Sequence, residues 1–164
     1  MVDGMRIAAL MIATMSTGLV AGVFGLYAHT IMPGLGRTDD RTFVGAFQSI
    51  DRAIINPWFL GGGFFGALVF GILAAVAHIG RDALTWIVAA LILYAITFVI
   101  TIAVNVPLND AIKAAGDPDR IDLAAVRARF GEARWAGWNL VRVITSTTAF
   151  GLLAWALTLS GKQS

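Results

Sequence analysis

The sequence contains no cysteine and only two histidines, His29 and His78, among 164 residues. Without cysteine the chain forms no disulfide, no thiolate metal site and no cysteine nucleophile. Charged residues are scarce as well, at 13% of the sequence, whereas an average soluble domain carries about 25%. A chain with so few charges lacks the polar surface that a globule in water needs, which excludes an ordinary soluble domain.

Apolar side chains make up 58% of the sequence, and the mean hydropathy is +0.79. Four apolar runs reach the length of about 20 residues that a helix needs to cross a bilayer. They are residues 7–32, 57–78, 83–104 and 143–161. We therefore expect a single all-α integral membrane domain over residues 1–164, built as a four-helix transmembrane bundle of two antiparallel hairpins. The first run is too long for the apolar core of a signal peptide, so we expect a retained helix.

The two long connections between the spans fall on the same membrane face. In the first, apolar residues from Phe43 to Ile54 recur at spacings of four, three and four, which is typical of one face of a helix. The second has a similar stripe from Leu123 to Phe130. We expect two partly helical amphipathic loops that either lie on the bilayer surface or cap the bundle.

The net charge is only +2, and no basic face with interleaved aromatic residues is present, so nucleic acid is not an expected partner. Lysine and arginine are instead distributed as in a membrane protein whose basic loops face the cytoplasm. One side of the bundle holds Arg6, Arg81 and Lys162. The other holds Arg37, Arg41, Arg52, Lys113, Arg120, Arg127, Arg129, Arg134 and Arg142. This bias predicts a cell-membrane protein with cytoplasmic long loops and both termini outside.

Small residues indicate how the first span packs, because helices in lipid approach each other through small side chains. Thr14, Gly18, Gly22 and Gly25 follow at spacings of four, four and three, and His29 lies four residues further. We therefore expect His29 on the packing face of this helix. The same glycines could instead join two copies of the chain in a homo-oligomer.

Polar side chains follow one face of the third span and one face of the last helix. The third span carries, at spacings of three, four and four, Tyr94, Thr97, Thr101 and Asn105. The last helix begins with Trp135, Trp138, Asn139 and Arg142. Polar groups at membrane depth usually face a bundle interior or a cavity, which makes them functional candidates. Because the spans are antiparallel, these stripes, His29 and Asn56 should meet at one membrane face.

We expect a pocket at this rim that binds a flat, hydrophobic aromatic molecule. The expected catalytic residues are His29, Asn139 and Arg142. The expected substrate-binding residues are Asn56, Asn105, Asn109, Trp135 and Trp138. Tryptophans stack on such a ligand, Asn and Arg stabilise an enolate-type oxygen, and His29 acts as the base. Asp51 and Glu132 are available to pair with the charge of Arg142.

A metal or haem held by two histidines is excluded, because His29 and His78 close opposite ends of a bundle about 30 Å thick. Each candidate also has a structural alternative. Asn105 could cap its own helix, which Pro107 is expected to end. Trp135 and Trp138 could belong to an interfacial aromatic belt, and Arg142 could reach the headgroups.

Three stretches carry a resemblance to a known family: "INPWF" at 55–59, "NVPLND" at 105–110, and "RWAGWNLVR" followed by "TSTTAFGLL" at 134–153. In these stretches the chain resembles the anthrone oxygenase family of small membrane proteins, and the likeness extends over nearly the whole chain. The matching positions are Asn56, Asn105, Pro107, Asn109, Trp135, Trp138, Asn139 and Arg142. His29 is a candidate from packing alone.

The resemblance implies a cofactor-independent monooxygenase, because some family members oxidise anthrones to anthraquinones without metal or organic cofactor. Its substrate would be an aromatic, polyketide-like molecule, oxidised with O2. The alternative is a non-enzymatic subunit that binds lipid or quinone and serves a partner complex. A third, purely structural role would leave no pocket and an Arg142 that faces headgroups.

Overall fold

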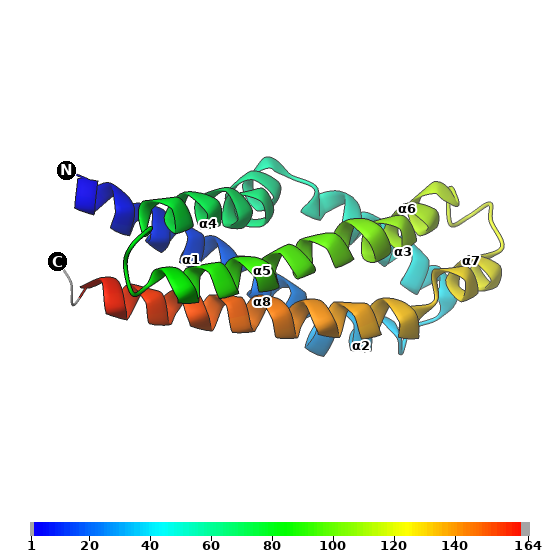
Figure 1. Cartoon of the computed structure of the whole chain (residues 1–164). Helices are drawn as coiled ribbons and strands as arrows, with labels where there is room; N and C mark the ends of the chain where they lie inside the picture. Colours follow the sequence, from blue (N-terminus) through cyan, green and yellow to red (C-terminus); the bar gives the residue numbers. More distant parts are fainter. Residues whose placement is uncertain (1, 162–164) are drawn as a thin grey trace.

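The computed structural model describes residues 2–161, and every regular element in that range is helical. Lys162, counted above among the basic residues, lies outside this range. Four helices are long and apolar enough to cross a membrane: Gly4–Leu35, Trp58–Ala77, Leu84–Ala114 and Leu123–Gly161. They run side by side, with both chain ends at the same end of the bundle (Figure 1). The all-α bundle predicted from the sequence is thus confirmed.

The first hairpin begins with α1 (Val2–Leu26), which continues through the π-helical turn η1 (Tyr27–Ile31) into α2 (Met32–Leu35). α3 (Asp40–Ile54) follows at the far end of the bundle. The chain returns through the π-helical segment η2 (Trp58–Phe65) and α4 (Gly66–Ala77). A tight turn then reverses it, where Gly80 adopts a φ of 79° that favours glycine.

The second hairpin begins with α5 (Leu84–Ile100), the π-helical turn η3 (Thr101–Asn105) and α6 (Val106–Ala114), which form one continuous helix. α7 (Leu123–Phe130) and α8 (Glu132–Gly161) complete the chain. In the bundle, α8 packs against both α1 and α5, and α4 packs against the same two helices.

Pro107 does not end the third helix, so that expectation is wrong. The helix continues to Ala114, because the π-helical turn before Pro107 changes the hydrogen-bond pattern where Pro107 has no N–H to donate. In this π-helical turn the Val106 N–H bonds to the Thr101 carbonyl, five residues earlier instead of four. Pro33 follows η1 and Pro57 precedes η2, so each π-helical segment adjoins a proline.

The stripe of small residues predicted for α1 packs against neighbouring helices at Thr14 and Gly18 but not at Gly22 and Gly25. Buried residues recur along Leu10, Ala13, Val20, Phe24 and Tyr27. A Cβ added at either Gly22 or Gly25 would meet nothing within 4 Å. The interior face of α1 therefore combines small side chains with the aromatic rings of Phe24 and Tyr27, and Gly22 and Gly25 lie off this face.

α3, α6 and α7 form a layer, here called the cap layer, over the end of the bundle away from the termini (Figure 1). Its core is an aromatic cluster in which Phe43 and Phe47 of α3 pack against Phe130 and Trp135. The apolar stripe of the first connection is buried at Phe43 and Phe47, so this amphipathic helix covers the bundle instead of only lying on lipid.

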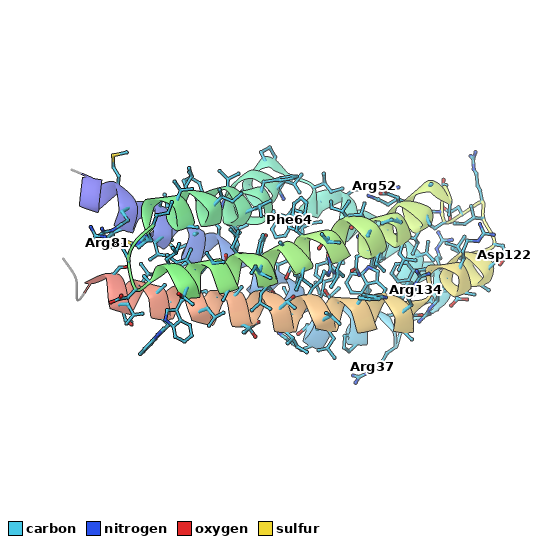
Figure 2. The ribbon with its side chains drawn as sticks, in the orientation of Figure 1. Arg37, Arg52, Phe64, Arg81, Asp122 and Arg134 are labelled. Atoms are coloured by element: carbon cyan, nitrogen blue, oxygen red, sulfur yellow. The ribbon has the colours of Figure 1, made fainter. Side chains whose placement is uncertain are left out.

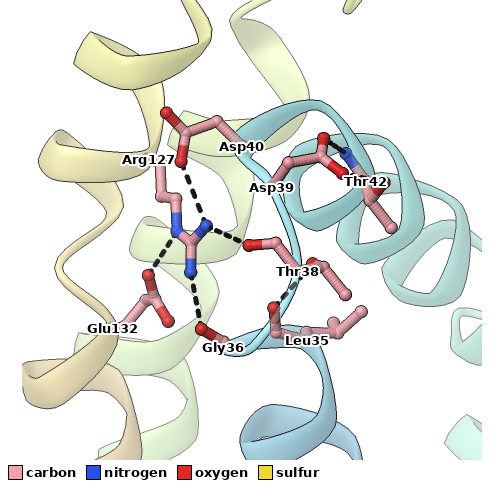
Figure 3. A network of polar contacts seen from close by, with 8 residues as sticks. All are labelled: Leu35, Gly36, Thr38, Asp39, Asp40, Thr42, Arg127 and Glu132. Carbon is pink, nitrogen blue, oxygen red and sulfur yellow. Dashed lines mark hydrogen bonds and ion pairs between the residues drawn. The ribbon is translucent and has the colours of Figure 1, made fainter.

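Polar contacts fasten the cap layer (Figure 3). The guanidinium of Arg127 on α7 bonds Glu132 at 2.6 Å, Asp40 at 3.0 Å and the Thr38 carbonyl at 2.8 Å. Asp39 caps α3 by accepting hydrogen bonds from the N–H and hydroxyl of Thr42, which lower the pKa of its carboxyl.

Candidate functional site

A cavity of about 280 Å³ lies where the cap layer meets the bundle. Its wall combines side chains from both hairpins and from α3. Most are apolar, including Phe24, Phe59, Phe64 and Ile102. The polar residues in the wall are Tyr27, Asp51, Thr101, Asn109, Asp110, Lys113 and Arg142. A mainly apolar cavity with a few converging polar groups is the usual form of a small-molecule site.

All three π-helical segments border this cavity. Tyr27 belongs to η1, Phe59 and Phe64 to η2, and Thr101 and Ile102 to η3. A π-helical turn shifts the following side chains around the helix, and such turns often occur at functional sites. The cavity is therefore placed where three of the bundle helices depart from regular α geometry.

Arg142 is the most unusual group in the wall, because it is a buried cation, 4% exposed, at membrane depth. It donates to the Asn139 amide oxygen at 2.7 Å and to the Thr101 hydroxyl at 3.3 Å. The Phe24 ring centroid lies 4.1 Å from its guanidinium carbon. Among the residues that the structure describes, no carboxylate lies within ion-pair distance of Arg142, and its Nε has no hydrogen-bond partner.

Because Arg142 is buried, it does not reach the headgroups. The predicted ion pair of Arg142 with Asp51 or Glu132 is also not formed. Glu132 pairs with Arg127, and Asp51 pairs with Lys113. A desolvated cation without a counter-charge is costly, and its free donor capacity is available to an oxygen that carries negative charge. Arg142 therefore brings an uncompensated positive charge to the cavity wall, which is the kind of group that stabilises an oxyanion.

Asn105 and Asn139 lie behind the cavity wall and are fully buried. Asn139 holds Arg142 through its oxygen and donates through its nitrogen to the Phe24 carbonyl at 3.1 Å. Asn105 donates to the Trp135 carbonyl at 3.3 Å and makes no cap hydrogen bond to its own helix end. Both asparagines are positioning residues that tie α8 to α1 and η3.

A second polar group joins α3, α6 and α8 at the other side of the cavity. The Trp135 indole N–H donates to the Asn109 oxygen at 2.7 Å, and the Asn109 amide donates to Asp51 at 2.6 Å. The other oxygen of Asp51 lies 2.8 Å from Lys113 Nζ, which also pairs with Asp110 at 3.0 Å. Asp51 is only 5% exposed, so the cavity holds one buried carboxylate.

Tyr27 was missed by the sequence analysis. It lines the cavity, its ring centroid lies 5.6 Å from that of Trp135, and its hydroxyl has no hydrogen-bond partner among the described residues. Asp51 was considered only as a counter-ion. Both could have been found by their spacing: Tyr27 follows Phe24 by three residues on a buried stripe, and Asp51 follows Phe47 by four.

Five of the eight predicted site residues come together here: Asn105, Asn109, Trp135, Asn139 and Arg142. Of these five, Asn109, Trp135 and Arg142 line the cavity, whereas His29, Asn56 and Trp138 belong neither to the cavity wall nor to this cluster. The inward orientation predicted for His29 is wrong, because His29 is exposed and bonds only to its neighbour Thr30. Tyr27 lies on the packing face of α1. His29 follows Tyr27 by two residues, which places it on the opposite side of the helix. We do not retain His29 as a base.

Asn56 and Trp138 also have local structural roles. The Asn56 side chain accepts from the Phe59 N–H and donates to the Ala53 carbonyl, so it caps the start of η2. Trp138 is 40% exposed on the outer face of α8, consistent with an aromatic belt.

No group of three His, Asp or Glu side chains in the described range is close enough to hold a metal ion. Within the cavity, the one buried carboxylate is already paired with Lys113 and Asn109.

Four membrane-length helices around a mainly apolar cavity with a buried arginine are the features of a small multi-pass membrane protein. A model of the anthrone oxygenase family matches residues 56–152, more than half of the chain. The chain belongs to this family. The matched region contains Asn109, Trp135 and Arg142, whereas Tyr27 and Asp51 precede it. No curated protein and no solved structure matches the chain.

Proposed function

We propose that the chain is a cofactor-independent oxygenase that converts an anthrone-type aromatic to the corresponding quinone within this cavity. The observation that carries the proposal is Arg142, a buried cation beside the cavity without a carboxylate partner. Family membership supports the same reaction class. An anthrone has a carbonyl oxygen that becomes an oxyanion when the opposite CH2 loses a proton, and this is the charge that Arg142 is placed to receive.

In the proposed reaction, Asp51 takes a proton from the CH2 group, and the carbonyl oxygen becomes an enolate held by Arg142 and the Tyr27 hydroxyl. The electron-rich carbon then reacts with O2 to form a hydroperoxide after protonation. Loss of water from the hydroperoxide leaves a second carbonyl group. One anthrone and one O2 give one quinone and one water, so the substrate itself supplies all the electrons.

The test follows O2 consumption and quinone absorbance by purified protein, with Arg142→Met and Asp51→Asn beside the wild type. We expect each variant to lose about 100-fold in rate, the usual effect of removing one oxyanion donor or general base. Trp138→Phe is the matched control on the outer face of α8 and should retain the wild-type rate. Equal rates in all four proteins, no faster than spontaneous oxidation, would overturn the proposal for this substrate class.

A second candidate is a non-enzymatic subunit that binds a membrane lipid or quinone. Its specific support is that several apolar residues of the cavity wall are also exposed on the outside of the bundle. This candidate requires an isoprenoid or lipid to co-purify with the protein and no turnover to be detectable. Mass spectrometry of the extracted protein distinguishes it from the oxygenase.

A further inference from the structure

One side of the cavity opens toward the outside of the bundle. Ile55, Phe65 and Ile102 all line the cavity, yet they are 55%, 46% and 49% exposed. Phe65 ends η2 and Ile102 lies in η3, and both segments belong to helices that cross the membrane. The surface on which these side chains are exposed is therefore surrounded by lipid.

The remaining walls are closed. Phe24, Tyr27 and Trp135 are at most 7% exposed, and the aromatic cluster of the cap layer covers the cavity from the loop side. Toward the headgroup level the opening ends at Asp110 and Lys113, which pair with each other. The opening is thus apolar over its length and charged at one end.

The opening follows a seam between the two hairpins. η2 packs on α1 of its own hairpin, whereas η3 packs on α8 of the other hairpin. Within the part of the chain that the structure describes, no backbone hydrogen bond joins η2 to η3. Exposed side chains change rotamer within nanoseconds, so Ile102 and Phe65 can admit a ligand without movement of the helices.

We propose that the cavity takes its ligand sideways from the bilayer, through the seam between η2 and η3. The ligand is an amphipathic molecule dissolved in the lipid, which keeps its polar end beside Lys113 and Asp110 until its apolar body has entered. The inference concerns the route into the cavity and holds whether or not the ligand is then oxidised.

Tryptophan fluorescence tests this route directly. Of the five tryptophans in the chain, only Trp135 lies in the cavity wall, and Trp58, Trp86, Trp138 and Trp155 are all exposed. Replacing these four by phenylalanine leaves Trp135 as the only reporter. A second variant keeps only Trp138 and serves as the control for full lipid contact. Trp138 lies about 4.5 Å further along α8 than Trp135, so the two side chains are at nearly the same depth.

Both proteins are placed in nanodiscs of phosphatidylcholine whose acyl chains carry bromine, a contact quencher. We expect strong quenching of Trp138 and clear quenching of buried Trp135, because an acyl chain enters the cavity. Ile102→Phe narrows the opening and should remove most of the quenching of Trp135. Ile92→Phe, at a lipid-facing position of α5 outside the cavity, should leave it unchanged.

Trp135 fluorescence that is as bright in brominated as in ordinary lipid would overturn the proposal. So would quenching that Ile102→Phe and Ile92→Phe change equally. The readout does not depend on catalysis, and a quenched Trp135 in a protein without anthrone turnover would retain the lateral route and reject the oxygenase.

Discussion

The guanidinium of Arg142 is surrounded by aromatic rings and neutral oxygens, and this has a consequence for stability. Removing this unpaired cation relieves a desolvation penalty of several kcal/mol, whereas the loss of its donor to the buried Asn139 oxygen costs about 1–3 kcal/mol. Arg142→Met should therefore leave the thermal unfolding midpoint unchanged or raise it, while oxygenase turnover falls. Unfolding in detergent and anthrone oxidation are measured on the same preparation. A variant that loses much of its stability would show that Arg142 mainly holds the helices together.

The two tyrosines of the chain provide a matched pair. The Tyr94 hydroxyl donates to the Phe64 carbonyl at 2.8 Å, whereas the Tyr27 hydroxyl faces the cavity without a protein partner. Tyr94→Phe removes this buried hydrogen bond and should cost about 0.5–1.5 kcal/mol of stability. Tyr27→Phe should not affect stability but should lower kcat about tenfold, since one hydrogen bond to the oxyanion is lost. Equal stability losses in both variants would contradict this assignment.

At the scale of the element, regular helical spacing explains which site residues could be predicted. α8 is regular from Glu132 to Gly161, and the spacing of Trp135, Asn139 and Arg142 placed them correctly on one buried face. On α1, the spacing of small residues predicts the packing face correctly at Thr14 and Gly18, but beyond Gly18 the interior is filled by Phe24 and Tyr27. The rule that small residues face neighbouring helices therefore holds only for the first part of the stripe, and it misplaces His29 together with Gly22 and Gly25.

The cap layer contains the site residues that helical spacing alone did not predict. Asp51 and Lys113 are 62 positions apart in the chain and meet only because α3 and α6 fold over the same end of the bundle. Periodicity within one helix contains no information about such a pair. The π-helical turns were likewise not predicted, although a proline beside each of them is visible in the sequence.

The π-helical segment η2 depends on a glycine at its end. A Cβ at Gly66 would lie 2.8 Å from the Gly61 carbonyl oxygen and 3.4 Å from Ser16 Oγ, whereas a Cβ at Gly62 would meet nothing within 4 Å. Gly66→Ala should therefore force the backbone to shift and cost about 1–3 kcal/mol. Gly62→Ala should stay within about 0.5 kcal/mol of the wild type. Thermal unfolding compares the two, and equal midpoints would show that η2 adapts without strain.

At the scale of the whole molecule, charge is divided between the two ends of the bundle. Arg37, Arg52 and Arg134 lie at the end with the cap layer, and Arg81 lies at the end with the termini (Figure 2). Basic residues near the ends of spans determine orientation, and the side that holds more of them stays in the cytoplasm. The cap layer, with Lys113 and Asp110 at the charged end of the seam, should therefore face the cytoplasm.

The absence of native cysteine makes this orientation measurable with single cysteines. Ile79 is 71% exposed in the turn between α4 and α5, and Arg120 is exposed between α6 and α7. In intact cells, a membrane-impermeant maleimide should label Ile79→Cys at once and Arg120→Cys only after lysis. The reverse pattern would place the cap layer outside. Because lateral entry brings the polar end of a ligand to Lys113, the same result determines which leaflet supplies the cavity: the cytoplasmic leaflet if Arg120→Cys is protected, and the outer leaflet if it is labelled first.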